Sequence, residues 1–302
     1  MKAFKLLSNT ALVFSLALLA SCSSNDDIEP ASNKVIEFTA NLDKGTAADE
    51  ATRATLESNN DVHWDLGDKL YVFCDNYEKP NLFSITPSSI NGASAKFTNF
   101  EDELPGSFNP DEFYYALFPF GAATFDISTS KITSVLPPSQ VVTKGYTYDK
   151  DGLIMIACAD SYDRVFNFKN VPALLKVSVS NNGEGKVKYI EVVSKNSANR
   201  LSGNFRATVS YGSDELKLEA ISDATVKHTV KLEIPASAEK QDFLIAALPG
   251  VLNNGYTLKF EDAKGNVLRE RTTKKGVSVE LESSKIYKFG SCDVAKDIPT
   301  EE

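Results

Sequence analysis

The stretch that decides the fold is "KVIEFTANL", residues 34–42, in which apolar and polar residues alternate. The apolar positions are Ile36, Phe38, Ala40 and Leu42. A period of two places these side chains on one face of an extended chain, because successive side chains of a β-strand point to opposite sides. The pattern predicts a half-buried first strand with Ile36, Phe38 and Leu42 pointing inward.

The same alternation recurs along most of the chain in short runs rich in β-branched and aromatic residues. Examples are "DKLYVFCD" (68–75), "EFYYALFPF" (112–120), "ALLKVSVSN" (173–181), "KVKYIEVVSK" (186–195), "HTVKLEIP" (228–235) and "KIYKFG" (285–290). Turn-forming residues bound these runs, and no amphipathic helix of about ten residues or more is indicated. Many short strands with frequent turns predict an all-β protein built from antiparallel β-sandwiches.

The length of the chain and a fresh series of strands after residue 165 predict two β-sandwich domains in tandem. We expect an N-terminal domain over residues 34–165 and a C-terminal domain over residues 166–290. The remaining tail, "SCDVAKDIPTEE" (291–302), is acidic and has almost no alternating apolar pattern. The last strand is therefore expected to end at Gly290, and the tail would make a poor β-strand.

The N-terminus has the composition of a secretory signal peptide. Lys2 and Lys5 precede an apolar run over residues 11–20, which is shorter than the roughly 20 residues that a membrane-spanning helix needs. The sequence "LASC" (19–22) resembles the bacterial lipobox, so we expect residues 1–21 to be removed and Cys22 to carry a lipid anchor. Residues 22–33 are predicted to form an acidic, flexible tether. Asp26 and Asp27 resemble the acidic residues that follow the lipid site in some lipoproteins exported to the outer membrane, and the resemblance implies that destination.

Charge and motifs exclude several classes of function. The chain of 302 residues has a formal net charge of −9, which argues against a nucleic-acid partner because phosphate backbones call for a basic surface. The two histidines, His63 and His228, are far apart in sequence, and neither has a second ligand at metal-site spacing. We therefore predict a protein that is not an enzyme and holds no metal or cofactor.

Other conspicuous residues have structural interpretations. The three cysteines after Cys22 are widely and irregularly spaced, so no disulfide framework is predicted. These cysteines are Cys74, Cys158 and Cys292. The segment Asp149–Leu153 resembles the start of a calcium loop, but the apolar run after it favours an Asp–Gly turn. Trp64, the only tryptophan, is expected to anchor a core or a turn.

Six motifs in a fixed order behind the lipobox resemble the fimbrillin-like family, the subunits of type V pili. They are "VHWDLGDKLYVF" (62–73), "YYALFPF" (114–120), "FKNVPALLKVSVSN" (168–181), "FLIAALPG" (243–250), "GYTLKF" (255–260) and "SKIYKFG" (284–290). The resemblance implies two transthyretin-like β-sandwich domains, secretion as a lipoprotein, and assembly with other fimbrial subunits into adhesive surface fibres. It also implies that an Arg-specific protease cuts within "TRATL" (52–56), at Arg53, and frees the strand that carries Ile36, Phe38 and Leu42.

The sequence departs from the family at its end, because many shaft subunits carry a C-terminal donor strand and this tail is a poor one. Tip, anchor and accessory roles are therefore as open as a shaft role. The alternative function is a glycan-binding surface lipoprotein of a nutrient-uptake system, which would also be β-rich and acidic. The adhesive ligand and the partner subunits are not specified by the sequence.

Overall fold

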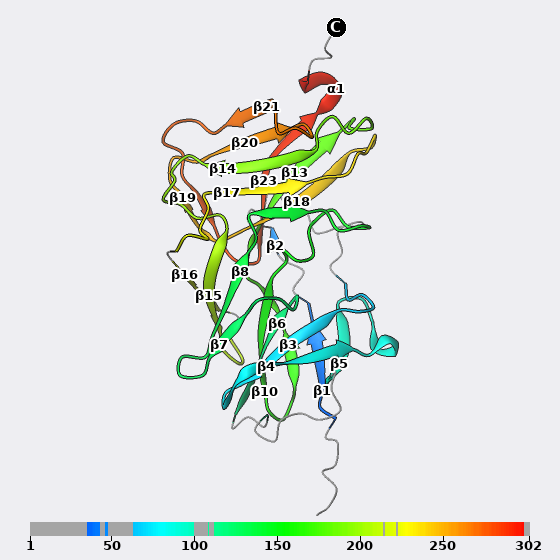
Figure 1. Ribbon diagram of the computed structural model, residues 1–302, viewed down its shortest axis with the longest axis vertical. Helices are drawn as coiled ribbons and strands as arrows, with labels where there is room; N and C mark the ends of the chain where they lie inside the picture. Colours follow the sequence, from blue (N-terminus) through cyan, green and yellow to red (C-terminus); the bar gives the residue numbers. More distant parts are fainter. Residues whose placement is uncertain are drawn as a thin grey trace, which may run out of the picture. The chain divides into compact units, whose positions relative to one another are not determined.

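The fold is known from a computed structural model that describes residues 35–42, 46–47, 63–99, 108, 112–213, 215–221 and 223–298 (Figure 1). In these residues the chain is almost entirely β-structure. The helical elements there are a 3₁₀ turn, Pro87–Ser89, and one short α-helix, α1 (Val294–Asp297). The all-β prediction is confirmed, and the strands belong to one compact unit, Asn33–Glu302.

The largest sheet, called here the first sheet, has the strand order β11-β1-β5-β4-β3-β6-β10-β12. Its strands are β1 (Glu37–Asn41), β3 (Lys69–Cys74), β4 (Tyr77–Ile85), β5 (Ser94–Asn99), β6 (Phe113–Phe118), β10 (Met155–Asp160), β11 (Val165–Asn167) and β12 (Lys169–Asn170). β11 and β12 follow one another in the chain but pair with opposite ends of the sheet, β11 with β1 and β12 with β10. The continuous segment 165–170 therefore links both ends of the first sheet.

A second sheet, in the order β16-β15-β8-β7, covers one face of the first sheet. Its strands are β7 (Thr124–Asp126), β8 (Lys131–Leu136), β15 (Gly203–Val209) and β16 (Leu216–Ala220). The ring of Phe125 stacks on Phe73 at 5.3 Å and lies 4.9 Å from Tyr115, centroid to centroid. Because β15 pairs with β8, residues far apart in sequence form this layer.

Two further sheets and a two-stranded ribbon are built mainly from the second half of the chain. The third sheet has the order β18-β13-β23-β2, the fourth β21-β20-β14-β17-β9, and the ribbon pairs β19 with β22. Their strands are β2 (Thr46–Ala47), β9 (Ser139–Val141), β13 (Ala173–Ser180), β14 (Tyr189–Ser194), β17 (Thr229–Glu233), β18 (Gln241–Ala247), β19 (Gly250–Leu252), β20 (Tyr256–Glu261), β21 (Val267–Thr272), β22 (Val279–Leu281) and β23 (Lys285–Asp293).

Most strand pairs are antiparallel, as predicted, but four named pairs in the described residues are parallel. They are β1 with β11, β13 with β23, β17 with β9, and β2 with β23. Each joins strands that are distant in sequence, as parallel pairing requires a crossover. Alternation identifies a strand but not the direction of its neighbour, so the sequence did not predict these pairs.

Two hydrophobic core clusters fill the interior, one made mainly of residues before 172 and one of later residues. Neighbouring residues on β13 belong to different clusters: Leu174 lies in the first, and Leu175 and Val177 lie in the second. The motif "ALLKVSV" predicts that all three lie mostly at or near the core of the second domain, which holds for Leu175 and Val177. Leu174 differs because β13 is buried on both faces at its start, so its side chain points away from theirs and enters the first core. The predicted domain boundary at 165/166 stays a prediction, and β11 lies across it.

The C-terminal segment folds back, contrary to the expectation that the last strand ends at Gly290. β23 continues to Asp293, and α1 follows it directly. The Asp297 carboxylate forms ion pairs with Arg269 at 3.2 Å and with Arg271 at 3.0 Å, and both arginines lie on β21. The C-terminal segment buries three residues in the second core, Cys292, Val294 and Ile298. Their irregular spacing explains why the period-two pattern missed them.

Candidate functional site

The first strand, β1, is hydrogen-bonded along both edges (Figure 1). On one side it pairs antiparallel with β5, and on the other it runs parallel to β11. Further bonds fix its ends: the Ile36 amide donates to Asn99 Oδ1 at 3.0 Å, and the Leu42 amide donates to the Ala93 carbonyl at 2.9 Å. The strand is therefore an inner member of its sheet.

The inward face of β1 fills the middle of the first core. The buried residues of this face are Ile36, Phe38, Ala40 and Leu42. The Phe38 ring stacks on Phe166 at 4.7 Å and meets Tyr114 at 4.8 Å and Phe83 at 5.0 Å, edge to face. These rings come from β11, β6 and β4, so one side chain of β1 joins three other strands. The inward orientation follows the predicted alternation, whereas removal of the strand stays a prediction.

Trp64 ties the backbone of β1 to the turn that precedes β3. Its indole Nε1 donates a buried hydrogen bond of 3.0 Å to the Ala40 carbonyl. Its ring packs edge to face on Phe97 and Phe118, each at 4.8 Å. The sequence predicted a core or turn anchor here, and the side chain is buried. The bond to Ala40 has no sequence signal, because it depends on how two segments meet.

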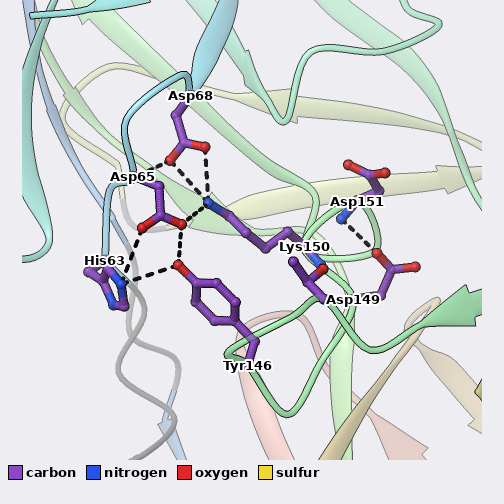
Figure 2. A network of polar contacts seen from close by, with 8 residues as sticks. His63, Asp65, Asp68, Tyr146, Asp149, Lys150 and Asp151 are labelled. Atoms are coloured by element: carbon purple, nitrogen blue, oxygen red, sulfur yellow. Dashed lines mark hydrogen bonds and ion pairs between the residues drawn. The ribbon is translucent and has the colours of Figure 1, made fainter. Parts of the chain in front are cut away.

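A cluster of polar side chains, called here the Lys150 cluster, holds this same turn to the loop before β10 (Figure 2). Lys150 Nζ lies 2.7 Å from Asp65 Oδ2 and 3.0 Å from Asp68 Oδ1. The Tyr146 hydroxyl donates to the Asp65 carboxylate and lies 3.2 Å from His63 Nε2. The Lys150 and Asp68 side chains are only 17% and 12% exposed, whereas Asp65 and His63, at 38% and 47%, are in contact with water.

The protonation states of the Lys150 cluster suit an anchor. Burial would raise the pKa of Asp65, but hydrogen bonds from Lys150 and Tyr146 outweigh burial and hold that pKa below its ordinary value. Burial, together with the bond to Asp65, raises the pKa of Tyr146. Near neutral pH the cluster therefore contains an ionised Asp65 and a neutral Tyr146 donor. This arrangement links residues 63–68 to the loop that carries Tyr146 and Lys150.

The other residues singled out by sequence have structural roles. The Asp149 carboxylate accepts hydrogen bonds from the backbone amides of Val141 and Asp151, each at 3.0 Å. The Asp149–Leu153 segment is a turn, as predicted. Among the described residues no group of three or more His, Cys, Asp or Glu is placed to hold a metal ion.

The three cysteines of the described part lie in the interior. Cys74, Cys158 and Cys292 are buried and outside any disulfide. Burial raises the pKa of the Cys158 thiol to about 12 and that of Cys292 to about 11, so both are protonated and poor nucleophiles near neutral pH. No helix within the described residues is long and apolar enough to cross a membrane.

The structure brings together some of the predicted site residues and not others. Ile36, Phe38 and Leu42 share one buried face of the first core. Cys22, the predicted lipid site, and Arg53, the predicted cleavage site, lie outside the described residues. Sequence reasoning missed the Lys150 cluster, whose members come from two segments about 80 residues apart.

Comparisons with known proteins found similarity among solved structures only. No family model and no curated protein matches the chain. The chain is similar to a candidate cell adhesion protein from Bacteroides ovatus, with 16% identity, a TM-score of 0.47, and 88% of this chain and 94% of that chain covered. A second such protein, from Bacteroides uniformis, has 14% identity, a TM-score of 0.44, and coverage of 86% and 95%.

The chain is also similar to the tip fimbrial protein Mfa3 from Porphyromonas gingivalis, in a form with a C-terminal truncation. Here the identity is 11%, the TM-score 0.31, and the coverage 82% of this chain and 92% of that chain. These neighbours are of the kind that a resemblance to the fimbrillin-like family predicts. Their low identities and TM-scores carry no functional assignment for this chain.

Proposed function

We propose that the chain is a non-enzymatic subunit of a type V pilus, exported as an outer-membrane lipoprotein through Cys22. It joins other fimbrial subunits by strand exchange after an Arg-specific protease cuts at Arg53, and it contributes to cell adhesion. The proposal rests on the sequence resemblance and on one structural observation, which is the position of β1 in the first sheet.

The position of β1 supports strand exchange because its departure would leave a groove that a foreign strand can fill. The covalent link from β1 to β3 runs through Arg53, so a cut there leaves β1 held to the later chain only by noncovalent contacts. Loss of β1 would leave β11 and the facing edge of β5 unpaired, while β5 keeps its pairing with β4, and it would uncover the rings around Phe38. Unpaired strand edges over an open apolar core readily accept another strand.

The groove also specifies what would fill it. The incoming strand must present apolar side chains at alternate positions, in place of Ile36, Phe38, Ala40 and Leu42. The second position should be aromatic, because three aromatic rings surround the Phe38 site. The third should be small, because Ala40 is fully buried beside Trp64. A partner subunit with the pattern large, aromatic, small, large is therefore expected.

The docking of residues 291–298 argues against this segment as a donor strand. Residues 291–298 complete β23 and α1, and Asp297 is held by two arginines. Using this segment as a donor would require breaking those ion pairs and opening the second core. The proposal therefore gives this chain the role of accepting a strand and leaves its place in the fibre open.

The test uses Trp64 as a built-in reporter of β1. The purified chain is treated with an Arg-specific protease, and tryptophan emission, fragment masses and oligomeric state are followed together. We expect a fragment that ends at Arg53, a red shift of the emission as Trp64 loses its cover, and recovery of the original emission when a peptide of residues 34–47 is added. An Arg53→Lys variant is the matched control, because it keeps the charge and resists the protease.

The proposal of strand exchange fails if the cut at Arg53 occurs and Trp64 emission, strand content and monomeric state all stay unchanged with candidate partner subunits present. That outcome would favour the alternative function, a glycan-binding lipoprotein of a nutrient-uptake system, since such a protein needs no protease-triggered assembly.

Lipid attachment is tested separately through Cys22. We expect Cys22→Ala to abolish labelling by a fatty acid and to move the protein out of the membrane fraction or block its processing, because the thiol is the attachment point. Continued fatty-acid labelling of the Cys22→Ala protein would show that the anchor lies elsewhere.

A further inference from the structure

Two tyrosines stand out on the surface of the N-terminal half. Tyr162 is 91% exposed, and it lies in the turn between β10 and β11. Tyr211 is 45% exposed, and it lies in the hairpin between β15 and β16. Most other aromatic residues described are packed in the cores, so these two rings are available to a ligand where the others are not.

The turn that carries Tyr162 is held in a single conformation by four hydrogen bonds. The Asp160 carboxylate accepts the Tyr162 amide at 2.7 Å, and the Asp160 carbonyl accepts the Arg164 amide at 3.0 Å. Arg164 Nε donates to the Ser161 carbonyl at 3.2 Å, and the Ser161 amide donates to the Glu112 carbonyl at 2.9 Å. These bonds restrain the backbone of the turn, so a ligand that binds Tyr162 does not have to order this loop.

The hairpin that carries Tyr211 is fastened to the same turn. The Tyr211 hydroxyl donates a hydrogen bond of 2.9 Å to Asp163 Oδ2, next to Tyr162 in the chain. The other side of the Tyr211 ring is supported by Phe113, with 5.9 Å between ring centroids and an angle of 36° between the planes. Asp163 therefore joins the hairpin that carries Tyr211 to the turn that carries Tyr162, and Tyr162, Asp163 and Tyr211 are called here the tyrosine patch.

The charges around the tyrosine patch are mainly negative. The hydrogen bond to Asp163 and the negative charges of Asp163 and Asp160 raise the pKa of Tyr211, so both carboxylates act on this ring. Arg164 is the basic residue of the turn. An acidic surface repels anionic ligands such as phosphates or sialylated glycans.

We propose that the tyrosine patch binds a neutral saccharide. A pyranose ring offers a face of C–H groups, which packs on an aromatic ring, and a rim of hydroxyl groups, which donate to carboxylates. The patch supplies both kinds of contact: the Tyr162 and Tyr211 rings are exposed, and the Asp163 carboxylate lies at the hydroxyl of Tyr211. A protein partner fits less well, because the buried centre of a protein interface is depleted of charged residues.

The experiment uses the purified, uncleaved chain on an array of neutral, sialylated and sulfated oligosaccharides, with deglycosylated host matrix proteins on the same surface. We expect binding to at least one neutral oligosaccharide. Its apparent affinity should fall at least about tenfold in a Tyr162→Ala/Tyr211→Ala variant, because stacking contributes only when the rings are present. Phe120→Ala is the matched control, because Phe120 is 48% exposed at another site and its loss should leave binding unchanged.

Unchanged Trp64 emission and melting temperature establish that the double variant is folded. Three results would overturn the proposal: no neutral oligosaccharide bound, equal binding by the folded double variant, or binding confined to deglycosylated proteins or anionic glycans. Since the uncleaved chain is used, the outcome does not depend on whether Arg53 is cut or strands are exchanged.

Discussion

The contacts of Phe38 set how firmly the first strand is held once its covalent link has been cut. The side chain is fully buried, and three aromatic rings from other strands lie within 5.0 Å of it, centroid to centroid. Replacing a buried Phe by Ala typically costs about 3–5 kcal/mol. Since about 1.4 kcal/mol is a factor of ten, Phe38→Ala should weaken retention of the cleaved strand by roughly two to three and a half orders of magnitude.

The measurement is the rate at which the strand leaves after a rapid cut with an Arg-specific protease. Trp64 emission reports departure, because its indole is bonded to the Ala40 carbonyl of the same strand. Among related complexes most affinity differences appear in the dissociation rate, so Phe38→Ala should speed release by most of the predicted factor.

The matched control is Glu37→Gln, on the outward face of the same strand. Glu37 pairs with Lys96 at 2.7 Å, and both side chains are about half exposed, so this substitution should change release by less than about fivefold. Release of the Phe38→Ala strand within about fivefold of the wild-type rate, after complete cutting at Arg53, would refute the reasoning that this ring anchors β1.

Other substitutions test the rest of the fold. Leu175→Ala should lower the free energy of unfolding by about 2–5 kcal/mol in denaturant titrations, since Leu175 is fully buried in the second core, and a loss below about 0.5 kcal/mol would contradict its placement. Lys150→Met should lower the free energy of unfolding by about 1–3 kcal/mol, a loss between those typical of exposed and of buried ion pairs. The pKa of Asp65 is lower in the folded protein than its ordinary value of 3.8, so ionised Asp65 stabilises the fold above pH 3.8, and this stabilisation is lost as the pH falls through the folded-state pKa. The difference in unfolding free energy between wild type and Lys150→Met should therefore be constant from about pH 5 to 7 and shrink below about pH 4. Ending the chain after Gly290 should lower stability by about 3 kcal/mol or more, because buried apolar side chains leave the second core, and an unchanged melting temperature would show that residues 291–298 do not contribute.

Local patterns in the sequence determined which segments are strands and which side of each strand faces inward. In "KVIEFTANL" the alternation identified the buried face of β1, because the pleat of a strand depends only on neighbouring residues. The same reasoning predicted an all-β fold, a buried Trp64 and a turn at Asp149–Leu153. It overlooked short strands such as β7, which lack several clear periods, and the last residues of β23.

Tertiary structure alone decided which strands are neighbours and which polar groups meet. The parallel pairing of β1 with β11, the closing segment 165–170, the Trp64 bond to Ala40 and the Lys150 cluster all join residues that are distant in sequence. A strand with one buried face can accept many partners, and the choice depends on how the whole set of strands buries its apolar faces together. Bringing distant segments together costs loop-closure entropy that only those combined contacts offset, so no local pattern encodes the pairing.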